Sequence, residues 1–125
     1  MSDSQNEVLN IAALKASLKQ FAVDREWEQF HSPKNLSMAL SVEASELLEI
    51  FQWMKEEDSW DISDPKLIEA VGDEVADIFV YLLRLATVLN LDLKELVDQK
   101  MLKNGKKYPV AKARGNSKKY TEFSD

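Results

Sequence analysis

One stretch of the chain decides its fold, and it reads DPKLIEAVGDEVADIFVYLLRLATVL over residues 64–89. Asp64 can cap a helix, and Pro65 suits the first helical position because proline has no amide hydrogen to lose there. Apolar residues then recur every three or four positions, at Leu67, Val71, Ile78, Leu82, Leu85 and Leu89. This spacing predicts an amphipathic helix of about 25 residues, long enough to form the centre of a helical bundle.

Other parts of the chain carry the same apolar spacing and predict further helices. One covers roughly residues 7–26, and another runs from the Ser32–Pro33 start signal to about residue 56. From Asp92 a capping-box pattern predicts a short fourth helix that stops at Gly105. Because no stretch of useful length alternates as a strand does, the sequence predicts an all-α bundle of about four helices.

Composition and charge predict how the chain is organised. It has 125 residues, of which 45% are hydrophobic, enough for one domain with its own core. Residues 1–99 hold 20 acidic and 8 basic side chains, whereas residues 100–125 hold 2 acidic and 8 basic ones. We expect a helical domain over residues 1–105 and a basic tail over residues 106–125, docked on the bundle or on a neighbouring subunit. Such a tail suits contact with polyphosphate or with nucleic acid, and the charge count does not choose between them.

The missing residue types exclude several kinds of chemistry. The chain has no cysteine and a single histidine, His31. Disulfides, thiolate metal sites and cysteine nucleophiles are therefore excluded, and the lone histidine argues against a serine–histidine triad. The sequence shows no secretory leader and no apolar run of about 18 residues, so we expect a cytoplasmic protein.

Four acidic side chains interrupt the apolar faces of the second and third expected helices. Glu43 and Glu46 lie three residues apart in one helix, and Glu74 and Asp77 have the same spacing in the other. Each pair therefore shares one side of its helix, and antiparallel packing would bring the four carboxylates into one partly buried pocket. Because like charges raise each other's pKa values and burial of an unpaired carboxylate is costly, a cation is needed there.

The ligand type predicts which cation this is. Carboxylates bind hard ions, so we expect Mg²⁺ first and Mn²⁺ second. Mg²⁺ usually completes its coordination with water and substrate phosphates, which predicts a phosphate ester or anhydride as the substrate. The alternative is structural: the acids lie at the edge of the bundle and pair with basic side chains such as Arg84.

The same acidic motifs carry a resemblance to a known family. Glu43-Ala-Ser-Glu46 and Glu74-Val-Ala-Asp77 look like the metal-binding signature of the MazG-like all-helical nucleoside triphosphate pyrophosphohydrolases. Four segments resemble the dCTP pyrophosphatase branch in particular: residues 24–31, 51–53, 107–109 and 119–121. The resemblance implies Mg²⁺-dependent cleavage of a dCTP-like nucleotide between the α and β phosphates. Monophosphate and pyrophosphate would be released, as nucleotide-pool housekeeping requires.

The resemblance also implies roles for individual residues. It assigns the metal to Glu43, Glu46, Glu74 and Asp77. A carboxylate of this cluster would orient or deprotonate the attacking water, and Glu46 is our own choice for that role. Around the base and sugar it places Trp27, Phe30, His31, Trp53 and Tyr81. Lys100, Asn104 and Lys107 are the phosphate candidates, since their spacing of four and three could line one helix face and its exit. Related sequences have a histidine where this chain has Leu18.

Partners and alternatives complete the expectations. The third helix is apolar nearly all round through residues 78–83, which predicts self-association, and the resemblance implies homodimers or homotetramers. We expect a nucleoside triphosphate substrate and neither a membrane nor a nucleic acid partner. A related enzyme acting on dUTP or phosphoribosyl-ATP stays open, as does a non-catalytic helical adaptor whose basic tail binds nucleic acid. A purely structural alternative also exists for the base and phosphate candidates. In it, Trp27 and Phe30 fill the space between helices, and His31 is a loop residue whose hydrogen bonds are made within the protein. Lys100 and Lys107 are then solvent-exposed side chains near a helix end.

Overall fold

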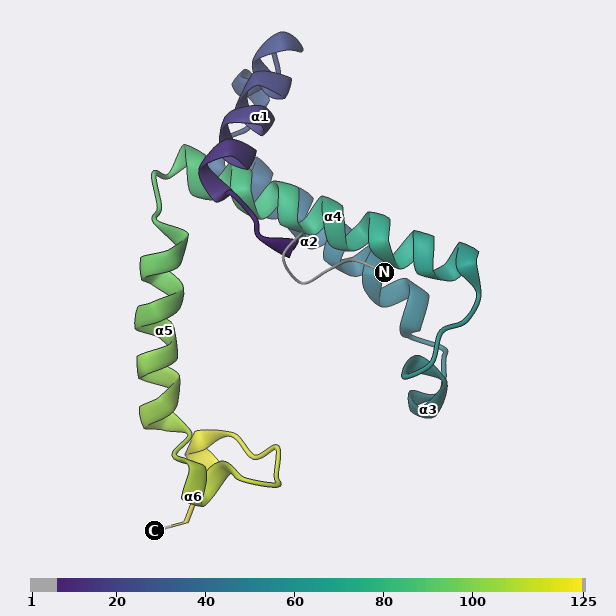
Figure 1. Ribbon diagram of the computed structural model, residues 1–125, viewed down its shortest axis with the longest axis vertical. Helices are drawn as coiled ribbons and strands as arrows, with labels where there is room; N and C mark the ends of the chain where they lie inside the picture. Colours follow the sequence, from purple (N-terminus) through teal and green to yellow (C-terminus); the bar gives the residue numbers. More distant parts are fainter. Residues whose placement is uncertain (1–6, 125) are drawn as a thin grey trace. The chain divides into compact units, whose positions relative to one another are not determined.

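The computed structural model describes residues 7–124, and every regular element in that range is helical (Figure 1). This confirms the all-α prediction. The longer helices are α1 (Ile11–Asp24), α2 (Pro33–Phe51), α4 (Pro65–Val88) and α5 (Leu93–Lys107). The short elements are η2 (Glu28–Phe30), α3 (Glu56–Ser59), α6 (Val110–Ala113) and η3 (Tyr120–Glu122). None of the helices in the described range is long and apolar enough to cross a membrane.

Three of the four long helices start where the sequence predicts them, whereas α1 begins at Ile11 after the cap Asn10 and not at about residue 7. Ser32 accepts a hydrogen bond from a first-turn backbone amide of α2 at 3.1 Å, and Pro33 follows it. Asp64 does the same for α4 at 3.0 Å, and Asp92 for α5 at 3.1 Å. Each side chain satisfies one of the amides that a helix leaves without a partner at its beginning.

Three predicted helix ends are wrong, for local reasons. The first helix ends at Asp24 rather than about residue 26, because Glu26 adopts a left-handed backbone with φ 55°. The second ends at Phe51 rather than about residue 56, because Lys55 has an extended backbone that interrupts the helix. Three acidic residues after Lys55 then favour the start of a separate helix, α3. The fourth passes through Gly105, which has no positive φ, and ends at Lys107.

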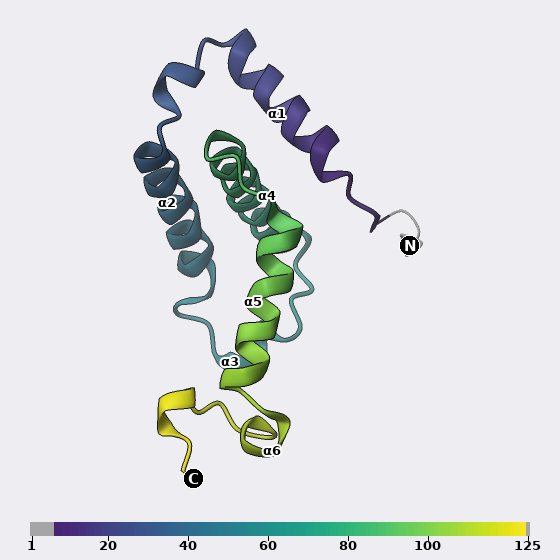
Figure 2. The ribbon, with the colours of Figure 1, turned by 90° about the vertical axis from the view of Figure 1, so that its left-hand side faces the viewer.

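The described chain forms two compact units, the first ending at Asn90 and the second beginning at Leu91. In the first unit α2 and α4 form an antiparallel hairpin and lie side by side, while α1 packs on α4 (Figures 1 and 2). The most deeply buried apolar side chains are Ala22 of α1, Leu36 of α2, and Leu83 and Ala86 of α4. The core is therefore small and lies near the carboxyl end of α4.

Much apolar surface of this unit stays exposed. Ile68, Val75 and Leu82 follow one another at seven-residue intervals on α4, and they are 51%, 52% and 40% exposed. Residues at that interval lie on one face of a helix, so they form a continuous apolar stripe. Met38 and Val42 are similarly exposed on α2.

The second unit holds α5 and a short aromatic cluster. The ring of Tyr108 meets the rings of Tyr120 and Phe123 edge-on, with centroids 6.1 and 5.7 Å apart. The Lys107 ammonium lies 4.8 Å from the centre of the Tyr120 ring. These contacts fold residues 108–123 into a compact end instead of an extended tail. The expected division into residues 1–105 and a docked tail stays a prediction.

Candidate functional site

Three of the four expected metal ligands come together where α2 and α4 pack. Glu43 and Glu46 of α2 and Glu74 of α4 each place a carboxylate oxygen within 4.8 Å of the others. Glu43 and Glu74 are half-buried, and Glu46 is exposed at the edge of the cluster. In both Glu43 and Glu74 one carboxylate oxygen, Oε2, is buried and has no hydrogen-bond donor among residues 7–124. Buried carboxylate oxygens without donors are expected where a cation binds, because the cation takes the place of the donors.

The acids of this cluster raise one another's affinity for a proton. A proton shared with the Glu74 carboxyl group raises the pKa of Glu43 above its ordinary value, and burial raises it further. The carboxyl group of Glu43 in turn raises the pKa of Glu46. A bound cation relieves the same repulsion without a proton, so the cluster favours either a metal ion or a protonated acid.

Arg84 does not neutralise these acids, although the structural alternative requires such a partner. Its side chain is 4% exposed and donates from Nε to Nδ1 of His31 at 3.3 Å. Within residues 7–124 the ion pair is Lys94–Asp98, which lies in α5. The acid cluster therefore has no basic partner in the described part of the chain.

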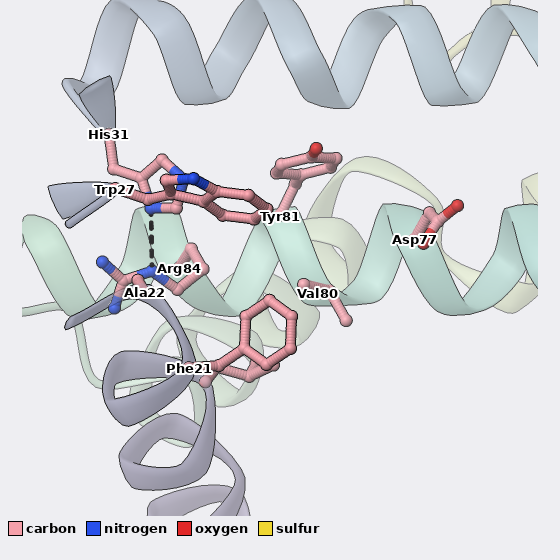
Figure 3. Close-up of a pocket in the computed structure, with 9 residues that line it drawn as sticks. Phe21, Ala22, Trp27, His31, Asp77, Val80, Tyr81 and Arg84 are labelled. Atoms are coloured by element: carbon pink, nitrogen blue, oxygen red, sulfur yellow. Dashed lines mark hydrogen bonds between the residues drawn. The ribbon is translucent and has the colours of Figure 1, made fainter. Parts of the chain in front are cut away.

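Asp77, the fourth expected ligand, lies outside the cluster. It is exposed on α4 about one turn beyond Glu74, and its charge makes the smallest of the contributions that raise the pKa of Glu43. It also lines a pocket at the carboxyl end of α4 (Figure 3). Asp77 thus stands between the acid cluster and this pocket.

The pocket has a volume of about 420 Å³, which is within the range of small-molecule sites. Three elements build it: α1, the connection from α1 to α2, and α4 (Figure 3). The lining residues are Leu18, Phe21, Ala22, Trp27, His31, Asp77, Val80, Tyr81 and Arg84. A mostly apolar cavity with a few polar groups is suited to a heteroaromatic ring.

A row of rings forms one wall of the pocket. Phe21 and Trp27 meet edge-on with centroids 5.8 Å apart, and Trp27 and His31 do so at 6.4 Å. Burial lowers the pKa of His31 below its ordinary value of 6.5, and the positive charge of Arg84 lowers it further, while Glu28 opposes both. His31 is therefore neutral at neutral pH and presents both a donor and an acceptor.

The structure separates the expected base contacts into two groups. Trp27, His31 and Tyr81 line the pocket. Phe30 does not line it and is 59% exposed, while Trp53 lies in the turn after α2 and is 89% exposed. In a single copy of the first unit, therefore, three of the five residues surround one cavity.

Sequence reasoning missed Phe21 and Arg84 as pocket residues. The available signal was Arg84 itself, a charged residue inside the apolar run at the end of α4, three positions after Tyr81. Such spacing puts Arg84 on the same helix face as Tyr81, which had been assigned to the nucleoside. Phe21 gave no such signal, because an apolar residue on a helix face is ordinarily part of the core.

The expected phosphate ligands belong to the second unit. Lys100 and Lys107 are exposed, and Asn104 is half-buried. Lys107 is held over the ring of Tyr120, as described above. Their role toward a phosphate stays a prediction.

Comparison with known proteins places this arrangement in a family. The model of the MazG-like family matches residues 38–123, which include the acid cluster and Arg84. The chain belongs to the MazG-like family. It is 42% identical over 108 residues to dCTP pyrophosphatase 1 of Bos taurus and 41% identical to the proteins of that name from Mus musculus and Homo sapiens.

These MazG-like relatives are longer proteins than the present chain. Each alignment covers 83% of this chain and 62% of the mammalian protein. A crystal structure of a pyrophosphatase from Archaeoglobus fulgidus DSM 4304 is similar with a TM-score of 0.70 and 37% identity. That match covers 82% of this chain and 95% of the archaeal one, so the two proteins share their fold over most of their lengths.

Proposed function

We propose that the protein is a Mg²⁺-dependent pyrophosphohydrolase that cleaves a dCTP-like nucleoside triphosphate to the monophosphate and pyrophosphate. The observation that carries this proposal is the pair of buried, donorless oxygens of Glu43 and Glu74 beside an aromatic pocket. The likeness to the mammalian dCTP pyrophosphatases supports the choice of substrate.

The acid cluster fits a hard divalent ion. Its carboxylate oxygens are the donors that Mg²⁺ prefers, with Mn²⁺ as a substitute, and the oxygens already approach one another within 4.8 Å. Glu43, Glu46 and Glu74 would hold the ion, and Asp77 would join them from the pocket side. When bound, Mg²⁺ supplies a Lewis acid that polarises the α-phosphate and activates water. We assign Glu46, which is exposed at the edge of the cluster, to orienting that water.

The pocket would hold the base and sugar. Trp27 and Tyr81 offer rings for contact with a base, and stacking of one base on one ring is worth about 1–3 kcal/mol. Asp77 lines the pocket and lies near the acids, so a nucleotide seated there would direct its phosphates toward the metal. We assign the phosphates to Lys100, Asn104 and Lys107 as well. Phe30 and Trp53 lie outside this pocket, and a second copy of the chain would have to bring them to the base.

Self-association is part of the same proposal. The exposed stripe through Ile68, Val75 and Leu82 needs cover, and a second α4 would match its seven-residue repeat. We expect a homodimer or homotetramer. Light scattering at micromolar concentration should give a multiple of 14.3 kDa, and a mass of 14.3 kDa alone would contradict the expectation.

The test measures pyrophosphate release from dCTP, dUTP, dTTP, dATP and dGTP, and from phosphoribosyl-ATP, with Mg²⁺ and with chelator. We expect turnover only with Mg²⁺ and fastest with dCTP, and Glu74→Gln should abolish it. Glu69→Gln is the matched control, because Glu69 is an exposed acid on the same helix, outside the cluster. Metal-independent turnover, or no turnover of any nucleotide, would overturn the proposal. Salt-sensitive retention of an oligonucleotide in its place would favour the adaptor.

A further inference from the structure

A buried guanidinium stands at one end of the aromatic pocket. Arg84 is 4% exposed, although it lines the pocket, and its Nε group donates to Nδ1 of His31 at 3.3 Å (Figure 3). Its Nη1 atom is also buried and has no hydrogen-bond partner in the described part of the chain. Burying a charged side chain that lacks one of its hydrogen bonds costs free energy. We therefore expect Arg84 to have a structural or functional role at this position.

The hydrogen bond from Arg84 determines which ring nitrogen of His31 carries the proton. An arginine side chain stays protonated and can only donate hydrogen bonds. Nδ1 of His31 must therefore be the acceptor, and in a neutral imidazole the proton then lies on Nε2. Because burial and Arg84 together lower the pKa of His31, a second proton is disfavoured.

Other charges near His31 do not reverse this preference. Glu28 of η2 raises the pKa of His31, but its contribution is smaller than those of burial and Arg84. On α4 the ionisable residues that line the pocket, apart from Arg84, are Asp77 and Tyr81, and neither contributes to the shift. The lining residues from α1 are all apolar.

We propose that Arg84 is a positioning residue that holds His31 in its neutral, Nε2-protonated form, so that this end of the pocket recognises a hydrogen-bond acceptor. Arg84 Nη1 is a further buried donor without a partner among the described residues, and it adds to the positive charge beside His31. Ring nitrogens of every base also accept hydrogen bonds. Because a carbonyl oxygen projects beyond the edge of the ring, we assign the Nε2 donor of His31 to a ring carbonyl. Cytosine and uracil carry one next to the glycosidic nitrogen, whereas adenine carries none. This last step rests on the function proposed above, and the state of His31 does not.

The state of His31 can be measured without substrate. His31 is the only histidine, so the imidazole nitrogens in a ¹H–¹⁵N spectrum of the full chain belong to it alone. We expect one tautomer protonated at Nε2 and a titration midpoint below 6.5. In Arg84→Met the midpoint should rise and the two tautomers should mix. A proton on Nδ1 in the wild type, or identical spectra for wild type and Arg84→Met, would overturn the proposal.

Control variants separate positioning from packing. Arg25→Met removes another guanidinium beside the pocket, one that lies 3.5 Å from the Phe21 ring centre, and should leave the His31 signals unchanged. Arg84→Met is expected to fold, because methionine fills a similar volume and the substitution removes a buried charge that has no carboxylate partner among the described residues. Should thermal melting show Arg84→Met to be unfolded, Arg84→Gln keeps a polar side chain that can either donate to Nδ1 or accept from it. The His31 tautomers should then mix in Arg84→Gln, and a wild-type spectrum in that variant would contradict the proposal.

Kinetics test the ligand class. Arg84→Met should raise KM for dCTP by about tenfold with kcat within about threefold, as expected when one charged hydrogen bond is lost in binding. Preference for dCTP over dATP should fall by a similar factor. His31→Gln, which keeps an amide near the place of Nε2, should be less impaired than His31→Asn. An unchanged KM and unchanged base preference in Arg84→Met would overturn the ligand class. If the wild type turned over no nucleotide, the proposed function would be overturned. The NMR spectra would then still test whether Arg84 sets the tautomer of His31.

Discussion

The acid cluster and the aromatic pocket lie on the same helix, α4, but they are built from different numbers of elements. The cluster needs α2 and α4 alone, and both of its helices show an i, i+3 pair of acids. The pocket needs α1, the connection through η2, and α4. A site formed by two helices can be predicted from the spacing of residues along each helix. A site formed by two helices and the connection before a third also depends on how that connection folds, which spacing does not predict.

Neutralising one acid should have the largest effect and should affect the cluster alone. Glu43→Gln is expected to lower kcat at least about a hundredfold, since the metal loses a ligand. Without Mg²⁺ the variant should melt above the wild type, because carboxylate repulsion is relieved. Pyrophosphate release and thermal melting with and without Mg²⁺ measure both effects. A variant as active as the wild type would remove Glu43 from the metal site.

Removing a ring should affect the pocket alone. Trp27→Ala is expected to raise KM for dCTP by about tenfold or more, at about 1–3 kcal/mol per stacked base, while kcat changes little. The stabilising effect of Mg²⁺ should be retained. Trp60→Ala is the matched control, because Trp60 is 84% exposed and does not line the pocket. Equal effects of the two substitutions would contradict the assignment of the base to this pocket.

The pH dependence of stability should distinguish the two regions by sign. The folded-state pKa values of Glu43 and Glu46 are raised above the ordinary value of 4.5, so the acids bind protons more tightly in the folded chain. Their contribution to stability is present below pH 4.5 and is lost as the pH rises through the raised values. Saturating Mg²⁺ should cancel this loss. The pKa of His31 is lowered, so its contribution is present above pH 6.5 and is lost as the pH falls.

The melting temperature, measured from about pH 4 to about pH 8 with and without Mg²⁺, shows how the contributions of the acids and of His31 change with pH. Glu43→Gln should flatten the metal-free trend. A metal-free profile that rises steadily with pH in the wild type would contradict the repulsion within the acid cluster.

The smallest effect is expected at Ser32, which lies between His31 of the pocket and the helix α2 that carries two acids of the cluster. Ser32 follows His31 and caps α2, where it accepts from a backbone amide at 3.1 Å. Ser32→Ala should reduce the free energy of unfolding by about 1 kcal/mol and leave kcat unchanged. Ser32→Asp keeps an acceptor and should retain the stability, as chemical denaturation can measure. A large loss of activity in Ser32→Ala would mean that the cap also positions His31.

The sequence specified the starts of α2, α4 and α5 and the acid pairs, because both features depend on neighbours within one or two turns. Ser32, Asp64 and Asp92 act as caps on amides within three residues of themselves. The end of α2 was not predictable from spacing, because apolar periodicity continues through Met54 while the backbone turns. Arg84 and His31 are 53 residues apart, and no local pattern indicates that they meet.

The products formed from dCTP and Mg²⁺ test most directly whether the acid cluster and the pocket act together in one reaction. Phosphorus NMR of the reaction should show dCMP and pyrophosphate, the products of attack between the α and β phosphates. Formation of dCDP and inorganic phosphate, or unchanged dCTP after prolonged incubation with Mg²⁺, would contradict the function proposed for this chain.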